Sequence, residues 1–196
     1  IDTKPRYFTD REIATLMAFA RLVLNELELR HVADTDGLTG VLSRRAWMTS
    51  AETEFARDKR YQHSVALGML DIDHFKSIND SFGHQVGDKV LKHFANQIGE
   101  SLRDTDVLGR YGGEEFAIVF PENNEQNAIE AIARIRTRLN DNPYVLDGET
   151  EKTIKFSAGV ALRQDNEAVL DTLKRADKAL YQAKENGRDR TKSATN

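Results

Sequence analysis

Asp71 and Asp73 stand at the end of an apolar stretch, SVALGMLDID, which reads as a strand from Ser64 to Asp73. Side chains alternate faces along a strand, so the two aspartates share one face and Ile72 points into the core. Carboxylates at the end of a buried strand are costly unless something compensates them. Carboxylate oxygens are ligands that Mg²⁺ prefers. The stretch therefore indicates either a divalent metal site or an Asp71 that simply caps the next element.

A second acidic pair follows two glycines in RYGGEEFAIVF, residues 110–120. We expect Gly112 and Gly113 to take positive φ in a tight turn and to leave room for a ligand. If the two strands are neighbours, Glu114 converges with Asp71, and a cation would relieve their repulsion. Glu115 would face away from Glu114 in a regular strand, so its role stays open.

The segment from His74 to Asp88 reads as a loop with a ligand-binding composition. Lys76 offers a positive charge to a phosphate. Asn79 and Asp88 can present acceptors to the edge of a base, and guanine N1–H and N2–H₂ would suit the aspartate. The loop lacks the G-x-x-x-x-G-K-[ST] spacing, which excludes a P-loop NTPase.

Lys184 and Arg188 lie near the end of the last expected helix. They could bind phosphate, or they could be an ordinary basic helix end favoured by the helix dipole.

Composition limits the class of protein. The 196 residues carry a net charge of −4, which gives no bulk electrostatic reason to bind a nucleic-acid polymer. There are no cysteines, which excludes disulfides and suits the cytoplasm. We expect no membrane contact by this segment, because no apolar run approaches the roughly 20 residues that span a bilayer. The first residue is isoleucine, so we expect a fragment of a longer chain.

Strand and helix patterns alternate along most of the chain, which predicts an α/β (α+β) sandwich with a central mixed sheet flanked by helices. The expected helices are 44–62, 86–102, 124–140 and 169–185, the strands are 64–73 and 154–162, and a hairpin covers 107–120 and turns at 111–113. The polar tail, 191–196, is expected to be disordered.

Residues 9–35 are predicted to form one long helix, which opens with a capping box between Thr9 and Glu12. Apolar residues repeat every seven positions, as in Ile13, Ala20 and Leu27. This seam favours a parallel two-helix coiled coil, although the helix could also lie on its own domain.

Five motifs together resemble the GGDEF family, the diguanylate cyclases, over Ala33 to Arg190. They are D-G-L-T-G from Asp36, D-I-D-H-F-K from Asp71, N-D-x-F-G-H-x-x-G-D from Asn79, R-Y-G-G-E-E-F from Arg110 and A-K-x-x-G-R from Ala183. One departure is Ser43, where members commonly have asparagine. The resemblance implies a catalytic domain at 36–190 with a nucleotidyl-cyclase, palm-like fold.

The resemblance implies condensation of two GTP into cyclic di-GMP and two pyrophosphates. The implied metal ligands for Mg²⁺ or Mn²⁺ are Asp71, Glu114 and the Ile72 carbonyl, with Glu114, Lys76 and Glu115 as catalytic residues. The implied GTP contacts are Asn79, Asp88, Phe75, Lys76, Gly112, Gly113, Lys184 and Arg188. Two domains would have to face each other, so the helix at 9–35 would hold a homodimer. Residues 1–8 resemble the end of a GAF sensor domain.

RDTD, residues 103–106, matches the family's inhibitory R-x-x-D motif. The resemblance implies that Arg103, Asp106 and Arg134 bind cyclic di-GMP as an inhibitor, although an arginine here could also be an ordinary surface residue. Two rival functions stay open: a silent domain that only binds cyclic di-GMP, and a structural dimerisation module. The second would leave the acidic residues unexplained.

Overall fold

The computed structural model describes residues 8–146 and 151–194, with the side chains of residues 25–33 left out. A six-stranded sheet has the order β1-β3-β4-β2-β7-β8, and β5 and β6 form a separate pair. The strands are β1 Leu42–Ser43, β2 Val65–Ile72, β3 Val107–Arg110, β4 Glu115–Pro121, β5 Tyr144–Val145, β6 Glu151–Lys152, β7 Phe156–Leu162 and β8 Thr191–Ser193. The helices are α1 Asp10–Asp34, α2 Arg44–Tyr61, α3 Phe75–Phe82, α4 His84–Gly99, α5 Glu125–Asp141 and α6 Val169–Glu185.

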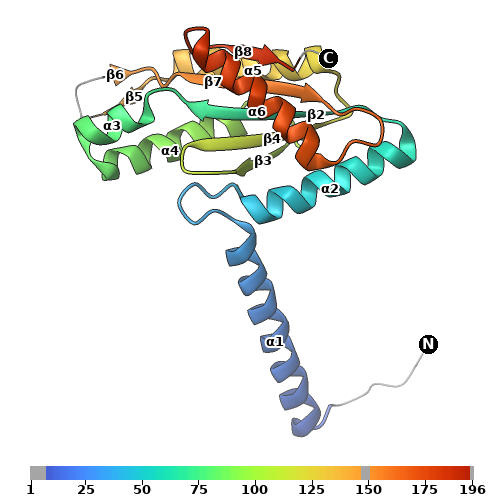
Figure 1. Ribbon diagram of the computed structural model, residues 1–196. Coiled ribbons are helices and arrows are strands. Elements are labelled where there is room, and N and C mark those ends of the chain that lie inside the picture. The colour runs from blue at the N-terminus through green and yellow to red at the C-terminus, as the bar shows by residue number, and fades with distance from the viewer. Residues whose placement is uncertain (1–7, 147–150, 195–196) are drawn as a thin grey trace.

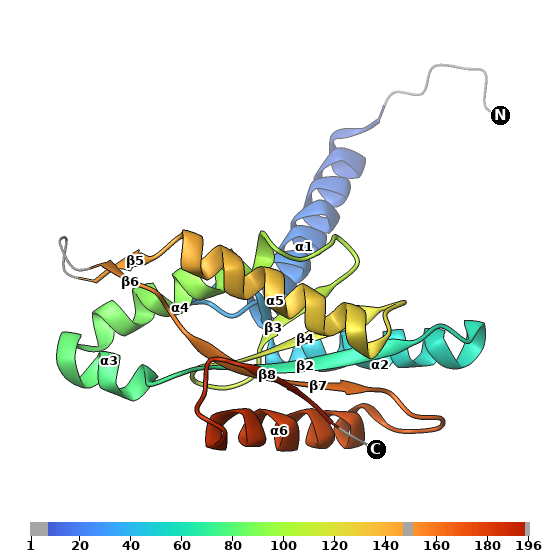
Figure 2. The same ribbon diagram turned by 90° about the horizontal axis from the view of Figure 1, so that it is seen from above.

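The sheet is mixed, as the sequence predicted. The pairs β1–β3 and β7–β8 are parallel, whereas β2 runs antiparallel to both β4 and β7. Helices α4 and α5 cover one face and α2 and α6 cover the other, so the predicted sandwich is confirmed (Figures 1 and 2). All eight residues of β2 are buried between these layers. The central strand is therefore held from both edges and both faces.

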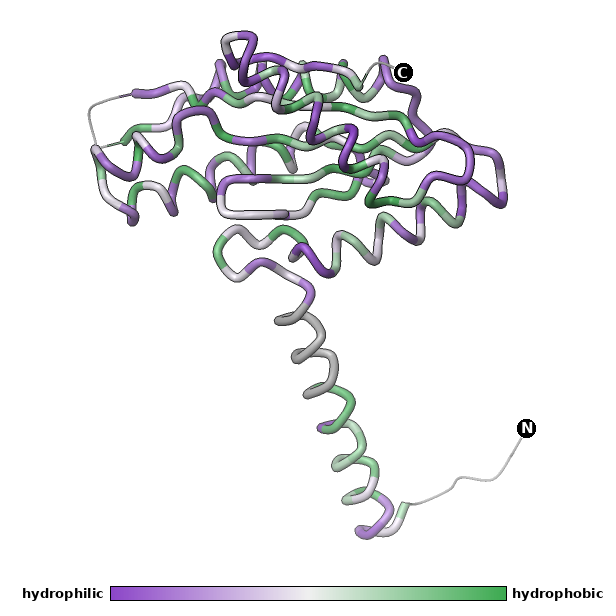
Figure 3. Tube along the Cα trace, viewed as in Figure 1, coloured by the Kyte–Doolittle hydropathy of each residue, from purple (hydrophilic) through white to green (hydrophobic). Residues whose placement is uncertain are grey.

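Helix α1 projects away from this body (Figure 1). The predicted capping box is present, because the Thr9 amide donates to Glu12 Oε2 at 2.8 Å and the Glu12 amide donates to Thr9 Oγ1 at 3.3 Å. Hydrophobic residues line the described half of α1 (Figure 3), and Leu16, Met17 and Val23 are all exposed. The side chain of Leu27 in the predicted seam and residues 1–7 of the GAF-like segment lie outside what the structure describes.

Two predictions of secondary structure are wrong. The segment after β2 is no loop, because Phe75–Phe82 form α3 and α4 begins at His84. The tail is not disordered at Thr191–Ser193, which pair with β7 as β8. The Ala194 amide also donates to the Val160 carbonyl at 2.7 Å, which extends the pairing.

Helix α6 approaches β7 so closely that only glycine fits between them. A β-carbon at Gly159 would overlap the Ala176 carbonyl oxygen and the Leu180 amide nitrogen, which belong to the backbone of α6. We expect Gly159→Ala to push α6 outward and to lower the free energy of unfolding by about 1–3 kcal/mol, the usual cost of overpacking.

The matched control is Gly99→Ala, because Gly99 ends α4 and has open space around its α-carbon. Alanine there should leave stability unchanged or raise it by less than about 1 kcal/mol. Urea denaturation of both variants measures the difference. Equal stability of the two variants would contradict the close packing of α6 on β7.

Candidate functional site

Three carboxylates gather where β2 ends and β4 begins. The register pairs Asp71 with Glu115, and the Ile72 amide donates to the Glu114 carbonyl at 3.3 Å. Directly opposite residues in an antiparallel pair share a face, so Glu115 lies on the face of Asp71. The prediction that Glu114 and Asp71 converge holds, because the charge of Asp71 acts on both glutamates.

Burial and mutual repulsion make these carboxylates hard to ionise. Burial raises the pKa of Asp71, and Lys184 only partly opposes this. Burial also raises the pKa values of Glu114 and Glu115, and the charge of Asp71 adds to both. Additional positive charge would therefore stabilise the ionised cluster.

Lys184 supplies one positive charge from the last turn of α6. Its Nζ lies 2.8 Å from Asp71 Oδ2, and Asp71 is only 5% exposed. Arg188 follows α6, and its charge also favours the ionised form of Asp71. The structure thus brings together Asp71, Glu114, Lys184 and Arg188, which the sequence analysis had selected from three separate motifs.

The glycine turn before β4 has free space beside it, but its two glycines do not have the predicted backbone conformation. Neither Gly112 nor Gly113 has a positive φ, so that expectation is wrong. A β-carbon at Gly112 would overlap the Glu115 carboxylate, so a larger residue there would require the Glu115 side chain to move. A β-carbon at Gly113 would meet nothing within 4 Å, so there is free space beside the turn.

The Arg110 side chain holds the glycine turn in place through hydrogen bonds. This side chain donates to the Gly113 carbonyl at 2.6 Å and to Asp36 Oδ1 at 3.1 Å. Asp36 also accepts from the Thr39 amide at 2.9 Å, which closes the D-G-L-T-G turn after α1. Neither Arg110 nor Asp36 was predicted to have a role, although both lie in the motifs that resemble the GGDEF family.

Asn79 and Asp88 lie on the adjoining helices α3 and α4. Asn79 Oδ1 is buried and has no hydrogen-bond partner among the described residues. Gly87 lies against it, because a β-carbon there would overlap that same oxygen. Asp88 and Lys76 are exposed, whereas Phe75 is buried in the core beneath α3. An orphaned acceptor beside an exposed carboxylate suits a ligand with several donors.

The R-x-x-D residues lie in a separate region. The Arg103 amide donates to Asp106 Oδ2 at 2.9 Å, while Asp106 Oδ1 is buried without a partner in the described part of the chain. Burial raises the pKa of Asp106, although the charges of Arg103 and Arg134 oppose it. Arg103 also lines a hollow of about 490 Å³ together with Arg57 of α2. Arg57 was missed, since nothing in its local sequence distinguishes it.

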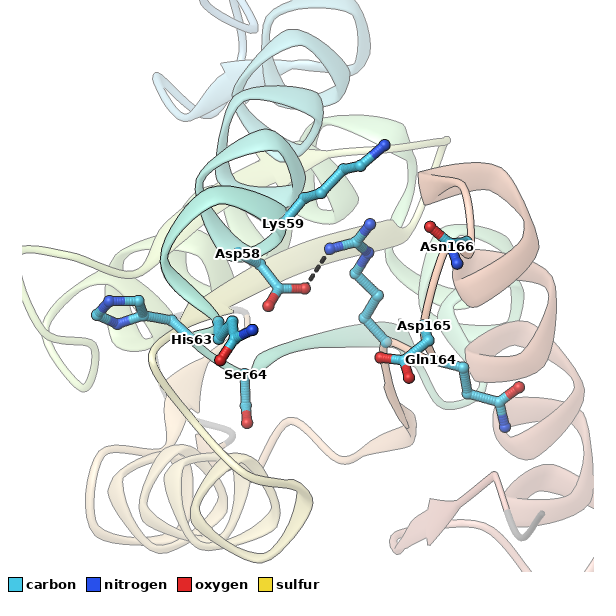
Figure 4. Close-up of a pocket in the computed structure, with 9 residues that line it drawn as sticks. Asp58, Lys59, His63, Ser64, Gln164, Asp165 and Asn166 are labelled. Atoms are coloured by element: carbon cyan, nitrogen blue, oxygen red, sulfur yellow. Dashed lines mark hydrogen bonds and ion pairs between the residues drawn. The ribbon is translucent and has the colours of Figure 1, made fainter.

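A hollow of about 400 Å³ lies at the opposite end of β2, around His63 and Ser64 (Figure 4). Its buried Arg163 is ion-paired with Asp58 and donates to the Phe55 carbonyl. The described lining therefore gives this cavity no unpaired buried charge that would point to chemistry.

No group of three or more histidine, cysteine, aspartate or glutamate side chains within the described residues is arranged to hold a metal ion. A cation at Asp71 would thus need main-chain or substrate oxygens as well, which is usual for Mg²⁺. None of the described helices is long and apolar enough to cross a membrane.

Comparison with known proteins agrees with these motifs. The sequence profile described as "Diguanylate cyclase, GGDEF domain" matches residues 33–190. The probable diguanylate cyclase DgcC of Escherichia coli is 39% identical over 175 residues, which are 89% of this chain and 47% of DgcC. Diguanylate cyclase DgcP of Pseudomonas aeruginosa is 42% identical over 165 residues, which are 84% of this chain and 24% of DgcP. The chain thus spans about half the length of DgcC and about a quarter of the length of DgcP.

A solved structure extends the likeness to the N-terminal helix. The coiled coil and GGDEF domain of DgcB from Caulobacter crescentus, in complex with c-di-GMP, superposes with a TM-score of 0.88 at 32% identity. The match covers 93% of this chain and 97% of that one. The chain therefore belongs to the GGDEF family of diguanylate cyclase domains.

Proposed function

We propose that this domain condenses two GTP into cyclic di-GMP and two pyrophosphates in the cytoplasm. The observation that carries the proposal is the cluster at the end of β2. The charges of Asp71 and Glu114 act on each other there, Lys184 pairs with Asp71, and the charge of Arg188 also acts on Asp71. Carboxylates for a metal next to cations for phosphate are what phosphoryl transfer requires.

Asn79 and Asp88 are proposed to recognise guanine. The buried Asn79 oxygen lacks a partner among the described residues, and the exposed Asp88 carboxylate adds a second acceptor. Guanine offers N1–H and N2–H₂ donors on one edge, whereas adenine has an acceptor at N1. Leaving a buried acceptor unpaired costs about 1–3 kcal/mol, so the site would discriminate against adenine.

The triphosphate is proposed to lie between α3 and the end of α6. The N-cap of α3, His74, makes no side-chain cap hydrogen bond. Amides in the first turn of a helix lack intrahelical acceptors and attract anions. The amides of Phe75 and Lys76 would bind phosphate oxygens, while the Lys76, Lys184 and Arg188 side chains neutralise the departing pyrophosphate.

Asp71, Glu114 and the main-chain oxygen of Ile72 would hold Mg²⁺ or Mn²⁺. The donor set fits, because Mg²⁺ prefers hard oxygen ligands such as these. Burial and repulsion raise the pKa values of Asp71 and Glu114, so a cation would stabilise their ionised forms. When bound, such a cation lowers the pKa of a ribose 3′-hydroxyl and shields the α-phosphate. Lys184 would leave Asp71 for the phosphates when the cation enters, since both require the same carboxylate.

Each 3′-oxygen would form a bond to the α-phosphorus of the other GTP, and the bond from that phosphorus to the pyrophosphate oxygen would break. Glu114 is proposed to assist removal of the hydroxyl proton, because it would lie beside the cation that lowers the pKa of that hydroxyl. Glu115, on the Asp71 face, would add negative charge that favours cation binding. Two such transfers close the ring.

A second domain must supply the partner GTP, and α1 is proposed to bring it near. The exposed apolar residues of α1 would pair with those of a second copy as a parallel coiled coil. Such tethering converts the encounter of two active sites into an intramolecular step.

The R-x-x-D region is proposed to bind cyclic di-GMP as an inhibitor. The orphaned Asp106 oxygen would accept from a guanine edge, and Arg103 and Arg134 would stack on bases or pair with phosphates.

Incubation with GTP and Mg²⁺, with chromatographic detection of products, tests the activity. We expect cyclic di-GMP and pyrophosphate from GTP and no corresponding product from ATP. Glu114→Gln should lower synthesis at least about 100-fold while the circular dichroism stays unchanged, since even residues behind metal ligands contribute about 10- to 100-fold.

Glu52→Gln on the exposed face of α2 is the matched control and should keep full activity. Near-full turnover by Glu114→Gln would contradict the metal assignment. A parent chain that binds cyclic di-GMP but never makes it would favour a silent binding domain.

Gly87→Ala tests the base pocket. The added methyl group would displace the Asn79 side chain, so we expect the KM for GTP to rise about tenfold, in line with one lost hydrogen bond. The kcat should change much less, because the displaced Asn79 side chain is proposed to contact the base and not the reacting phosphate. Gly99→Ala introduces the same exchange in the same helix and should change neither constant. An unchanged KM in Gly87→Ala would argue against base recognition by Asn79.

Arg103→Ala tests the inhibitory site. Initial rates should become insensitive to added cyclic di-GMP, with the uninhibited rate preserved, because Arg103 lies outside the catalytic cluster. Arg60→Ala removes a different exposed arginine, one that lies on α2, and this variant should be inhibited by cyclic di-GMP as strongly as the parent. Identical inhibition curves for Arg103→Ala and the parent would exclude this region as the inhibitory site.

A further inference from the structure

The turn between α6 and β8 has a backbone that is unusual for its residues. Gly187, Arg188 and Asp189 follow one another with φ values of 101°, 60° and 47°. Positive φ is ordinary for glycine but uncommon and strained for other residues. Two non-glycine residues in this conformation imply that their surroundings hold them there.

Asp73 supplies the restraint. Its Oδ2 accepts from the Asp189 amide at 2.9 Å, and its Oδ1 accepts from Ser157 Oγ at 2.8 Å. Asp73 is only 7% exposed, and Ser157 on β7 is fully buried. Because Asp73 closely follows the central strand β2, it ties the turn to the most constrained element of the fold.

The Asp189 side chain is anchored independently. Its carboxylate accepts from Arg136 Nη1 of α5 at 2.5 Å and from Lys155 Nζ at 2.7 Å. Arg136 also donates to the Phe156 carbonyl at 2.8 Å. Burial would raise the pKa of Asp189, but the bond from Lys155 and the charge of Arg136 outweigh it and lower that pKa. Asp189 thus remains a charged anchor.

The two aspartates of D-I-D therefore have different surroundings. Asp71 faces Lys184 and the two glutamates, whereas both oxygens of Asp73 are already used within the fold. We propose that Asp73 is a positioning residue that fixes the Arg188–Asp189 turn so that the Arg188 guanidinium faces the terminal phosphates of the substrate. This inference rests on the proposed function for the role of Arg188.

Asp73→Asn is the direct test, because asparagine keeps the size but replaces one acceptor oxygen with a donor. Binding is measured by calorimetry in Mg²⁺ buffer with α,β-methylene-GTP, which cannot release pyrophosphate, and with GMP, which lacks the terminal phosphates. We expect Asp73→Asn to weaken binding of the triphosphate about tenfold, as for one charge-assisted contact, and to leave GMP binding unchanged.

Arg188→Ala should show the same pattern. The double variant should bind the triphosphate no more weakly than Arg188→Ala alone, since both changes remove one contact. Asp165→Asn, on an exposed loop at the other end of the sheet, should behave like the parent. Ser157→Ala removes the hydrogen bond to Asp73 Oδ1 and should weaken binding of the triphosphate by a smaller factor. This variant keeps the test valid if Asp73→Asn does not fold.

Three results would overturn the role of Asp73: equal weakening of GMP and the triphosphate, full additivity with Arg188→Ala, or triphosphate binding unchanged in both Asp73→Asn and Ser157→Ala. A parent chain that binds neither nucleotide would instead contradict the proposed function itself.

Discussion

The position of β2 is the constraint on which the site depends. The strand pairs with β4 on one side and β7 on the other, and every residue from Val65 to Ile72 is buried. Asp71 at its end cannot move away from the neighbouring carboxylates without breaking these pairings. The repulsion among Asp71, Glu114 and Glu115 is therefore relieved by positive charge rather than by rearrangement. This is why a rigid apolar strand is useful behind an acidic site.

Much of this architecture could be predicted from periodicity. The long helices and the buried strands are regular enough for their patterns to identify them. Helix α3 was missed because its eight residues are largely polar and end at Gly83, which resembles a loop composition. Strand β8 was missed because Thr191–Ser193 carry no apolar alternation, and only pairing with β7 makes them a strand. Both errors concern elements that tertiary contacts define.

Only part of the candidate site could be predicted from the sequence, because part of it depends on contacts between strands. Residue types and motif order pointed to Asp71, Glu114 and Lys184, but pairing register is not a local property of either strand. The register places Glu115 on the face of Asp71, which a reading of β4 alone could not reveal. The Glu115 carboxylate occupies the space that a side chain at position 112 would need, which the local sequence does not reveal.

Side-chain hydrogen bonds connect the end of α1 and the segment after it to α2 and to the glycine turn. The last residue of α1, Asp34, accepts from Arg45 of α2 at 2.7 Å. Two residues later, Asp36 binds Arg110, which also binds the Gly113 carbonyl. Burial would raise the pKa of Asp36, but its bonds from Thr39 and Arg110 lower it, so this link stays ionised. The segment after α1 is thus joined to the glycine turn by side-chain hydrogen bonds through Arg110.

The ion pair between Lys184 and Asp71 compensates the charge of the buried carboxylate in the absence of a cation. Lys184 lies on α6, which is fixed against β7 by the close approach at Gly159, while its side chain stays 32% exposed. Because the Asp71 side chain is only 7% exposed, the proposed divalent cation would have to take over the charge compensation that Lys184 provides. The backbone of α6 need not move, since a lysine side chain is long enough to exchange a carboxylate for a nearby phosphate.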